Sequence, residues 1–261
     1  MKKTALVTGA SGGIGLELAR VLAREGHDLW LVARSAPKLE ALRKELSAAY
    51  PVSVQVLVRD LAEPSCAGEV FEELRKKGVS VDVLVNNAGI GFFGAFAETP
   101  LSEHERLINL NILSLTQLTR LFLGPMLEKK SGKILNVAST AAFQPGPLLA
   151  AYYASKAYVL HLSEALAEEL RGSGVTVTTL YPGPTATDFQ ERARMGGSKL
   201  FKRAVMDAKT VAEAGYRGLS SGKTLVIPGF SNKLLALSSR FAPRFLVPRV
   251  VRMIQEKDKK G

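Results

Sequence analysis

Tyr152 and Lys156 are the two side chains whose types and spacing point most directly to proton transfer. Four residues apart on a predicted helix, they share one face and their side chains can meet. A phenol ordinarily titrates near pH ~10, too high for easy proton exchange at neutrality. A neighbouring ammonium stabilises the phenolate and lowers that pKa. The pair predicts a tyrosine that gives a proton to a carbonyl oxygen, or takes one from an alcohol.

Two adjacent tyrosines compete for this role. Tyr153 has Ala157 four residues on, whereas Tyr152 has Lys156, so we assign the proton transfer to Tyr152. Ser139, predicted at the end of a strand, would hydrogen-bond the same oxygen and hold it in place. The alternative is a purely structural Tyr–Lys pair, which leaves the serine unexplained.

A glycine-rich segment near the start of the chain suits a phosphate ligand. It reads Thr8-Gly9-Ala10-Ser11-Gly12-Gly13-Ile14-Gly15. Glycines permit a tight turn and close backbone approach, and a helix N-terminus presents free N–H groups to a pyrophosphate. Many glycine clusters are only structural turns, but this one lies between the first predicted strand and the first predicted helix. It therefore predicts a dinucleotide site.

The end of the second predicted strand decides between the two nicotinamide cofactors. An acidic residue there would bond the ribose hydroxyls of NAD and repel a 2′-phosphate. This chain has Ala33-Arg34-Ser35 instead. A guanidinium beside a hydroxyl suits a phosphate monoester, although a solvated surface arginine is the plainer interpretation. We predict NADP(H), with NAD(H) as the less favoured cofactor.

Apolar runs of strand length alternate with helical patterns along the chain. The predicted strands are residues 4–8, 29–32, 52–58, 81–86, 134–139, 175–181 and 224–227. The predicted helices are residues 14–25, 37–49, 64–77, 102–129, 150–171 and 210–221. Strands without polar alternation, separated by helices, indicate a parallel sheet covered on both faces. We predict an α/β, doubly wound Rossmann fold with a seven-stranded parallel sheet, forming one domain over residues 1–261.

The ordered set of motifs over about residues 4–229 resembles the classical short-chain dehydrogenase/reductase family. The motifs are the glycine turn, Asp60-Leu61, Asn86-Asn87-Ala88-Gly89, Asn111, Ser139, Tyr152-x-x-x-Lys156 and the run from Pro182 to Thr187. The resemblance implies that Asn111, Ser139, Tyr152 and Lys156 are catalytic. It gives Asn111 a relay water to hold and gives Lys156 the nicotinamide ribose as well.

Cofactor contacts follow from the same resemblance, together with Arg34. Asp60 would meet the adenine, Asn87 and Ala88 the ribose, and Thr185 and Thr187 the carboxamide and phosphate. The full set is Gly9, Ser11, Gly13, Ile14, Gly15, Arg34, Asp60, Leu61, Asn87, Ala88, Gly89, Tyr152, Lys156, Pro182, Gly183, Thr185 and Thr187. Gly12 stands where some NADP-using relatives carry a basic residue, which leaves Arg34 as the main candidate for the 2′-phosphate.

The net charge of +11 is confined to one part of the chain. Residues 1–189 hold 19 basic and 19 acidic side chains, whereas residues 190–261 hold 16 and five. No nucleic-acid motif accompanies the basic part, so we expect no nucleic-acid partner. One cysteine and three scattered histidines predict neither a disulfide nor a metal site. Cys66, at a predicted helix start, is expected to have a somewhat lowered pKa and is assigned no role.

The basic part contains a predicted substrate lid at about residues 188–210 and an extension at about residues 230–261. The lid is either a solvated loop or attracts an acidic substrate, such as an acyl thioester. The extension mixes apolar residues with basic ones only, and residues 214–255 contain no acidic residue. It could rest on anionic lipid as a peripheral membrane contact, or pack over the substrate mouth or a partner subunit. Pro248 is expected in the first turn of a terminal helix.

Loops expected beside the nicotinamide carry Phe92, Phe93, Phe96 and Phe143, with Pro145 and Leu148. They predict an apolar pocket for a lipophilic carbonyl compound or its alcohol. The sequence thus predicts an NADP(H)-dependent oxidoreductase. The alternatives are a 3-oxoacyl-thioester reductase and a non-catalytic NADP(H)-binding or membrane-associated regulatory protein, which would not need the tyrosine acid. Lacking a signal peptide and a run of ~18 apolar residues, the chain is expected to be cytoplasmic. The resemblance implies a homodimer or homotetramer.

Overall fold

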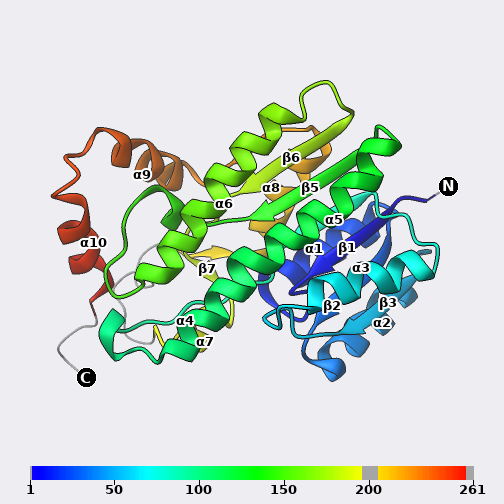
Figure 1. The fold of residues 1–261 in the computed structure, drawn as a ribbon, viewed down its shortest axis with the longest axis horizontal. Helices are drawn as coiled ribbons and strands as arrows, with labels where there is room; N and C mark the ends of the chain where they lie inside the picture. Colours follow the sequence, from blue (N-terminus) through cyan, green and yellow to red (C-terminus); the bar gives the residue numbers. More distant parts are fainter. Residues whose placement is uncertain (1, 196–204, 257–261) are drawn as a thin grey trace.

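The computed structural model describes residues 2–195 and 205–256. Its main sheet is parallel and has the strand order β3-β2-β1-β4-β5-β6-β9 (Figure 1). These strands are β1 (Thr4–Thr8), β2 (Asp28–Ala33), β3 (Val54–Val58), β4 (Val83–Asn86), β5 (Gly132–Val137), β6 (Val175–Leu180) and β9 (Leu225–Val226). The predicted seven-stranded Rossmann fold is confirmed. A separate parallel pair joins β7 (Thr185–Ala186) to β8 (Met206–Asp207).

Helices cover both faces of the sheet, which explains why its central strands are almost wholly apolar. One face carries α1 (Gly13–Arg24), α2 (Ala36–Ala49) and α8 (Ala208–Ser220) over one buried apolar cluster. The other carries α3 (Cys66–Lys76), α5 (Leu115–Glu128) and α6 (Ala150–Glu169) over a second cluster. The smaller helices are α4 (Leu101–Ile108), α7 (Phe189–Arg192), α9 (Phe230–Phe241) and α10 (Val247–Gln255).

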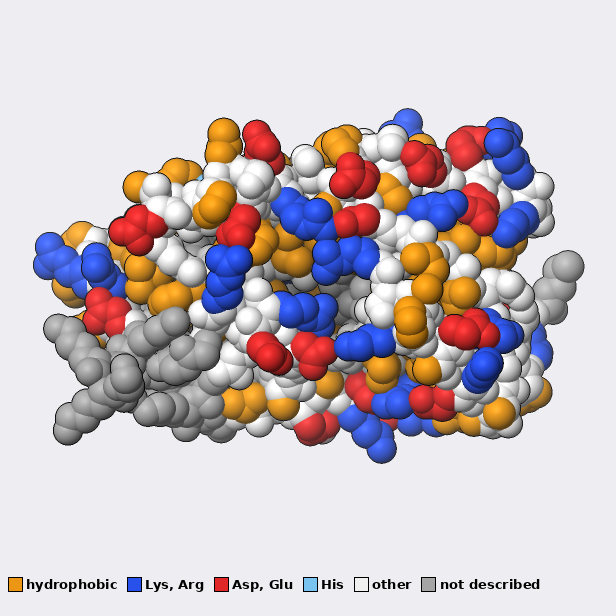
Figure 2. All heavy atoms as spheres, turned by 90° about the horizontal axis from the view of Figure 1, so that it is seen from below, with side chains coloured by type: hydrophobic (Ala, Val, Ile, Leu, Met, Phe, Trp, Pro, Cys, Tyr) orange, Lys and Arg blue, Asp and Glu red, His pale blue; other side chains and the backbone are white. Residues whose placement is uncertain are grey.

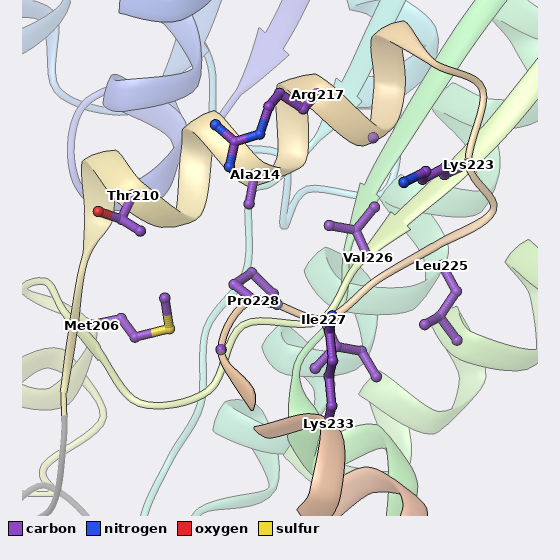
Figure 3. A pocket seen from close by; sticks show the side chains of 12 residues that line it. Met206, Thr210, Ala214, Arg217, Lys223, Leu225, Val226, Ile227, Pro228 and Lys233 are labelled. Carbon is purple, nitrogen blue, oxygen red and sulfur yellow. The ribbon is translucent and has the colours of Figure 1, made fainter. Parts of the chain in front are cut away.

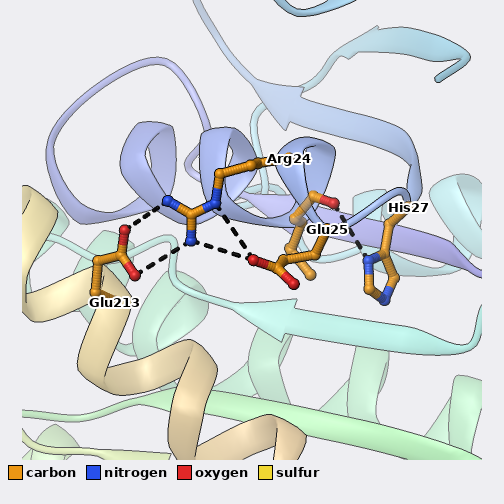
Figure 4. Close-up of polar contacts among 5 residues, drawn as sticks. Arg24, Glu25, His27 and Glu213 are labelled. Carbon is orange, nitrogen blue, oxygen red and sulfur yellow. Dashed lines mark hydrogen bonds and ion pairs between the residues drawn. The ribbon is translucent and has the colours of Figure 1, made fainter. Parts of the chain in front are cut away.

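An ion pair ties the first helix to the last helix of the same face. The Arg24 guanidinium on α1 donates to both carboxylate oxygens of Glu213 on α8, at 2.8 and 3.2 Å, and also to Glu25 (Figure 4). Beside it, His27 Nδ1 lies 3.2 Å from the carbonyl oxygen of Leu22. Desolvation by burial lowers the pKa of His27, so this histidine is a neutral, structural group.

The predicted helix over residues 102–129 is one feature that the structure revises. It is α4 and α5 joined by a π-helical turn over Asn109–Ser114. A π-helical turn inserts one residue into the helical repeat, and such turns are frequent at functional sites. The inserted turn holds the buried side chain of Asn111.

The C-terminal residues form two helices that project from one end of the sheet, drawn in orange and red in Figure 1. Pro248 lies in the first turn of α10, as the sequence predicts. In the described residues no helix is both long and apolar enough to span a membrane.

Cys66 is the chain's single cysteine and begins α3 in a buried position. The expectation of a lowered pKa is wrong. Burial raises the pKa of the Cys66 thiol to about 11, and nearby carboxylates such as Glu69 add to the rise. The helix start does not compensate, because the thiol has lost its hydration.

Candidate active site

The glycine turn between β1 and α1 is as tight as its sequence suggests. Gly9 and Gly13 have φ values of 66° and 56°, a conformation that disfavours other residues. A Cβ on Gly9 would lie 2.7 Å from the Asn87 amide nitrogen, and one on Gly15 would overlap the carbonyl of Gly9. No side chain caps the first turn of α1, so its N–H groups are available to an anion. This donor set fits a pyrophosphate.

Thr8 fastens the turn to the end of β4 and is a contributor that the sequence reasoning did not single out. Its buried hydroxyl donates to the carbonyl of Val85 at 3.1 Å and accepts from the backbone N–H groups of Asn87 and Ala88, both at 3.0 Å. The Asn87 side chain in turn donates to the Thr8 carbonyl at 2.9 Å. Asn87 therefore holds the turn by its amide, whatever it contributes to a cofactor.

Arg34 and Asp60, predicted from separate motifs, lie together at the ends of β2 and β3. Arg34 Nη1 is 4.0 Å from Asp60 Oδ2, and the Arg34 side chain is half exposed. Asp60 also accepts from Arg106 of α4 and from the backbone N–H of Ala62. Burial alone would raise the pKa of Asp60, but these hydrogen bonds and the two guanidiniums lower it. Asp60 is thus a carboxylate that positions Arg34 and Arg106.

Two further cations lie beside the glycine turn, and sequence reasoning did not connect them to it. Lys38 Nζ on α2 is 3.6 Å from Asp188, and Arg192 Nη2 on α7 is 3.5 Å from the same carboxylate. A Cβ on Gly12 would lie 3.8 Å from Arg192 Nη2. The Arg192 guanidinium therefore supplies a positive charge next to Gly12, which has no side chain of its own. Lys38 lies four residues after Arg34, and this short spacing can be seen in the sequence. Figure 2 shows Lys and Arg side chains gathered around a hollow near the middle of one face.

Helix α6 brings Tyr152 to Ser139, which lies just beyond the end of β5. The Ser139 hydroxyl accepts from the Ala141 N–H at 3.1 Å and donates to the Pro182 carbonyl at 3.4 Å, and it lies near enough to the Tyr152 phenol to lower its pKa. Lys156, one turn along α6, is buried, and its ammonium lies 5.8 Å from the centroid of the Tyr152 ring. It donates to the carbonyl of Val137 at 2.9 Å. The predicted catalytic pair and its serine are therefore neighbours.

The protonation of this pair is governed by burial. Desolvation raises the pKa of Tyr152 to about 12, against a smaller lowering by the nearby Ser139 hydroxyl. The same loss of water lowers the pKa of Lys156 to about 8. In the protein by itself the ammonium does not depress the phenol pKa as expected from the sequence, because the low-dielectric surroundings penalise both charged forms. Tyr152 is thus a neutral proton donor at neutral pH.

Asn111 braces the site from the π-helical turn. Its side-chain oxygen accepts from the Ile90 N–H at 3.0 Å, and its amide donates to the Ile90 carbonyl at 2.9 Å and to Ser155 Oγ at 3.0 Å. Three of the four hydrogen-bonding positions of the amide are filled by protein. The side chain fixes the loop after β4 against α6.

The segment after β6 closes over the glycine turn. Pro182 accepts at its carbonyl from the Thr140 N–H at 2.9 Å, which joins the ends of β5 and β6. Thr187 packs on Gly13, where a Cβ would lie 3.0 Å from the threonine methyl. The Thr185 hydroxyl donates to the Gly183 carbonyl at 2.9 Å. Thr187 therefore packs against the turn, whereas the Thr185 hydroxyl is bonded within its own loop.

Apolar side chains wall the Tyr152 ring, but they are not all the ones predicted. Phe189 of α7 is in ring contact with Tyr152 at 5.3 Å between centroids, and Phe93 packs in the same cluster. The cluster is completed by Ala141, Leu149, Tyr153, Ala193, Met195, Val247 and Val251. Phe143 instead contacts Tyr181 at 4.9 Å, and Phe96 is exposed against His104. Of these phenylalanines, Phe93 therefore joins the cluster around Tyr152, whereas Phe96 and Phe143 contact other rings.

The predicted lid is described only in part. Residues 189–195 are tethered by the Phe93 N–H, which donates to the Ala193 carbonyl at 3.0 Å, and by an Arg194–Glu103 ion pair at 3.1 Å. The remaining lid cations, Lys199, Lys202 and Arg203, lie outside the described residues.

A family model for short chain dehydrogenases matches residues 3–196, the part of the chain that holds every predicted site residue. The chain belongs to this family. It is 34% identical over 230 residues to a very-long-chain 3-oxoacyl-CoA reductase of Anas platyrhynchos, covering 86% of this chain and 72% of the relative.

Solved structures of short-chain dehydrogenases agree with the fold. A dehydrogenase from Sphingobium yanoikuyae in complex with NADPH is 33% identical with a TM-score of 0.83, over 98% of this chain and 99% of that one. The bulky-bulky ketone specific alcohol dehydrogenase from Comamonas testosteroni is 30% identical with a TM-score of 0.79, over 92% of each chain.

As a short-chain dehydrogenase, the chain gathers its predicted residues at the carboxyl ends of its parallel strands. This is the edge where ligands bind in open α/β sheets. A pocket of about 600 Å³ lies apart from these residues, between α8, β9 and the start of α9 (Figure 3). Arg217, Lys223 and Lys233 line it.

Proposed function

We propose that this chain is an NADP(H)-dependent oxidoreductase that interconverts a lipophilic ketone or aldehyde and its alcohol. The observation that carries the proposal is the buried Tyr152 phenol, which has Ser139 and Lys156 as neighbours and lies within apolar walls. These groups can hold a carbonyl oxygen and give it a proton. A binding or regulatory protein would gain nothing from this arrangement.

Each residue has a distinct task in the proposed reaction. Ser139 holds the substrate oxygen, and Tyr152 donates the proton to it during reduction or removes one from the alcohol in reverse. Lys156 neutralises charge on the phenol and binds the ribose, while Asn111 keeps the loop after β4 in place. The bound nicotinamide supplies or accepts the hydride. Phe189 and its neighbours exclude water from the Tyr152 ring.

Replacing Tyr152 by phenylalanine tests the proton donor. Tyr152→Phe should lose at least ~10²-fold in turnover, because general acid catalysis contributes about this much, yet still bind NADPH. Turnover is followed as NADPH oxidation on a panel of ketones, aldehydes, steroids and 3-oxoacyl thioesters. Tyr153→Phe is the matched control and should keep turnover within a few-fold. Wild-type turnover in Tyr152→Phe would remove Tyr152 from the mechanism.

Arg34 is proposed to select NADP(H) over NAD(H), with Lys38 and Arg106 close by. A guanidinium–phosphate pair is strong when forked and charge-assisted. Arg34→Asp should therefore shift the NADPH/NADH ratio of kcat/KM toward NADH by at least ~10-fold, since the change removes one attraction and adds one repulsion. Arg171→Asp, on an exposed arginine beyond α6, is the control and should leave the ratio unchanged. An unaltered ratio in Arg34→Asp would assign the 2′-phosphate to another group.

A 3-oxoacyl thioester is the second candidate substrate. It is favoured by the relative that is named a very-long-chain 3-oxoacyl-CoA reductase and by the cation Arg192 at the cleft. The substrate panel separates the two candidates, because only a thioester reductase prefers the acyl thioester to the free ketone.

The remaining proposals concern the molecule as a whole. We infer one catalytic unit over residues 1–261, in the cytoplasm, assembled as a homodimer or homotetramer. The long helices offer partly exposed apolar residues for self-association, among them Leu127 and Tyr158. Light scattering that gave the mass of a single chain would contradict the assembly.

A further inference from the structure

The C-terminal helix α9 turns its large apolar side chains away from the protein. Phe230, Leu234, Leu237 and Phe241 follow the spacing i, i+4, i+7, i+11 and share one face. Their exposed fractions are 82, 58, 54 and 81%. The opposite side, which contacts the protein, carries Ala236 and the polar Asn232. This is the reverse of an ordinary surface helix, whose apolar stripe faces the core.

Helix α10 repeats the pattern while remaining anchored. Its buried side carries Val251 and Gln255, and the Gln255 amide donates to the Tyr153 hydroxyl. A second apolar stripe, Leu246, Val250 and Met253, is exposed. The helix therefore has one apolar face in use against the site and another that nothing within the described residues covers. We call the two stripes, with the exposed Phe245 between them, the C-terminal apolar surface.

The charged residues that adjoin the two stripes along the chain are cations, although Arg252 is also ion-paired with Glu256 at the end of α10, at 3.1 Å. Lys233 adjoins Leu234, and Arg249 and Arg252 adjoin Val250 and Met253 along the chain. Arg217 and Lys223 line the pocket at the start of α9 together with Lys233 (Figure 3). No acidic residue occurs between Glu213 and Glu256. Apolar stripes flanked by Lys and Arg are the pattern of helices that lie in a lipid interface.

The alternatives to lipid fit this charge pattern less well. A second copy of the chain, docked by the same surface, would bring the same cations against one another. An exposed apolar surface of this extent in a monomer indicates an interaction site. Anionic lipid headgroups complement the cations, and the acyl chains complement the phenylalanines and leucines.

The surface is continuous with a cavity beside the candidate active site. The turn between α9 and α10 supplies Ala242 and Arg244, and the first residue of α10 supplies Val247, to a cavity of about 720 Å³ that Tyr153 also lines. The segment from α9 to α10 thus carries the exposed stripes and also lines a cavity beside Tyr153, the residue next to Tyr152.

We propose that the C-terminal apolar surface docks the enzyme onto an anionic lipid bilayer. Flotation with vesicles tests this without any substrate, so the result is independent of the proposed reaction. The full-length protein should float with vesicles of phosphatidylcholine and phosphatidylglycerol and not with phosphatidylcholine alone.

Two variants and their controls locate the contact. Phe230→Ser/Phe241→Ser removes apolar area, and Lys233→Glu/Arg249→Glu reverses charge; each should lower the partition coefficient at least ~10-fold. The matched controls alter exposed residues elsewhere and should bind as wild type: Phe96→Ser/Leu101→Ser for apolar area, and Lys44→Glu/Lys76→Glu for charge. Thermal melts and NADPH binding confirm that each variant is folded.

The proposal is overturned if the wild type does not float, or if the folded double serine variant floats equally well. It is also overturned if the wild type ignores vesicles and the serine variant instead lowers the mass of the assembly in light scattering. That result would assign the surface to a second copy of the chain.

Discussion

At the scale of single residues, the site keeps two ionisable groups away from water and shifts their pKa values apart. Tyr152 is raised to a pKa of about 12 and Lys156 lowered to about 8. Both shifts favour the neutral forms, so a buried ammonium at pH 7 carries a desolvation cost. Within the part of the chain that the structure describes, the Val137 carbonyl is the one hydrogen-bond acceptor of this ammonium, at 2.9 Å. The buried lysine therefore lowers the stability of the folded protein at neutral pH.

Lys156→Met should raise the free energy of unfolding at pH 7 by about 1–3 kcal/mol, since it removes a buried charge. The sign depends on pH. The folded pKa of about 8 lies below the ordinary lysine value of 10.5, so the unfolded chain binds more protons between these two values. The wild type is therefore stabilised as pH rises through this window, and the variant's advantage should shrink from pH 7 to 10.5. Denaturant melts at both pH values measure it; an unchanged difference would contradict the assigned pKa.

At the scale of elements, a buried polar chain fixes the helices against the sheet. Asn86 of β4 donates to Thr119 of α5 at 3.0 Å and to Asn136 of β5 at 2.9 Å. Asn136 donates onward to Ser163 Oγ of α6 at 2.9 Å. Ser163 lies two turns beyond Lys156 on the same face. Apolar contacts tolerate sliding, whereas this hydrogen bond sets the axial position of the helix that carries Tyr152.

Ser163→Ala should lower the free energy of unfolding by about 1–3 kcal/mol, because the Asn136 amide loses its buried acceptor. Turnover should fall as well, since α6 is then free to shift. Denaturant melts and NADPH oxidation report the two effects. Ser47→Ala, on the exposed side of α2, is the control and should change neither. Normal stability in Ser163→Ala would show that water replaces the serine.

At the scale of the whole molecule, the sequence predicts the features that local patterns determine and misses those that depend on contacts between distant residues. The sheet and the strand-end residues follow from local patterns, because a buried strand must be apolar and a phosphate turn needs glycines. Arg106 and Arg192 reach the cleft from helices distant in sequence, so no local pattern identifies them. Around the π-helical turn, residues 107–115 are apolar at most positions, so no change of the apolar spacing marks the turn in the sequence.

The structure also shows where some of the basic residues after residue 189 lie in the fold. Among the described residues after 189, Arg192 lies beside the glycine turn, and Lys233, Arg249 and Arg252 lie on the two C-terminal helices. The sequence left open whether the C-terminal extension packs over the substrate mouth or meets lipid. The two faces of α10 allow both, since Gln255 reaches Tyr153 while Met253 is exposed. Which face of α10 packs against the protein and which is exposed depends on tertiary packing, and the apolar periodicity of the sequence does not reveal it.

The buried thiol of Cys66 also makes the protein convenient for site-directed labelling. Maleimide reagents attack thiolates, and a buried thiol with a pKa of about 11 is almost wholly protonated at pH 7. A cysteine introduced in place of Phe241 or Leu101 would therefore carry a fluorophore alone, with the native thiol left in place. The fluorescence of an environment-sensitive dye at each position would then report whether position 241 or position 101 enters an apolar medium.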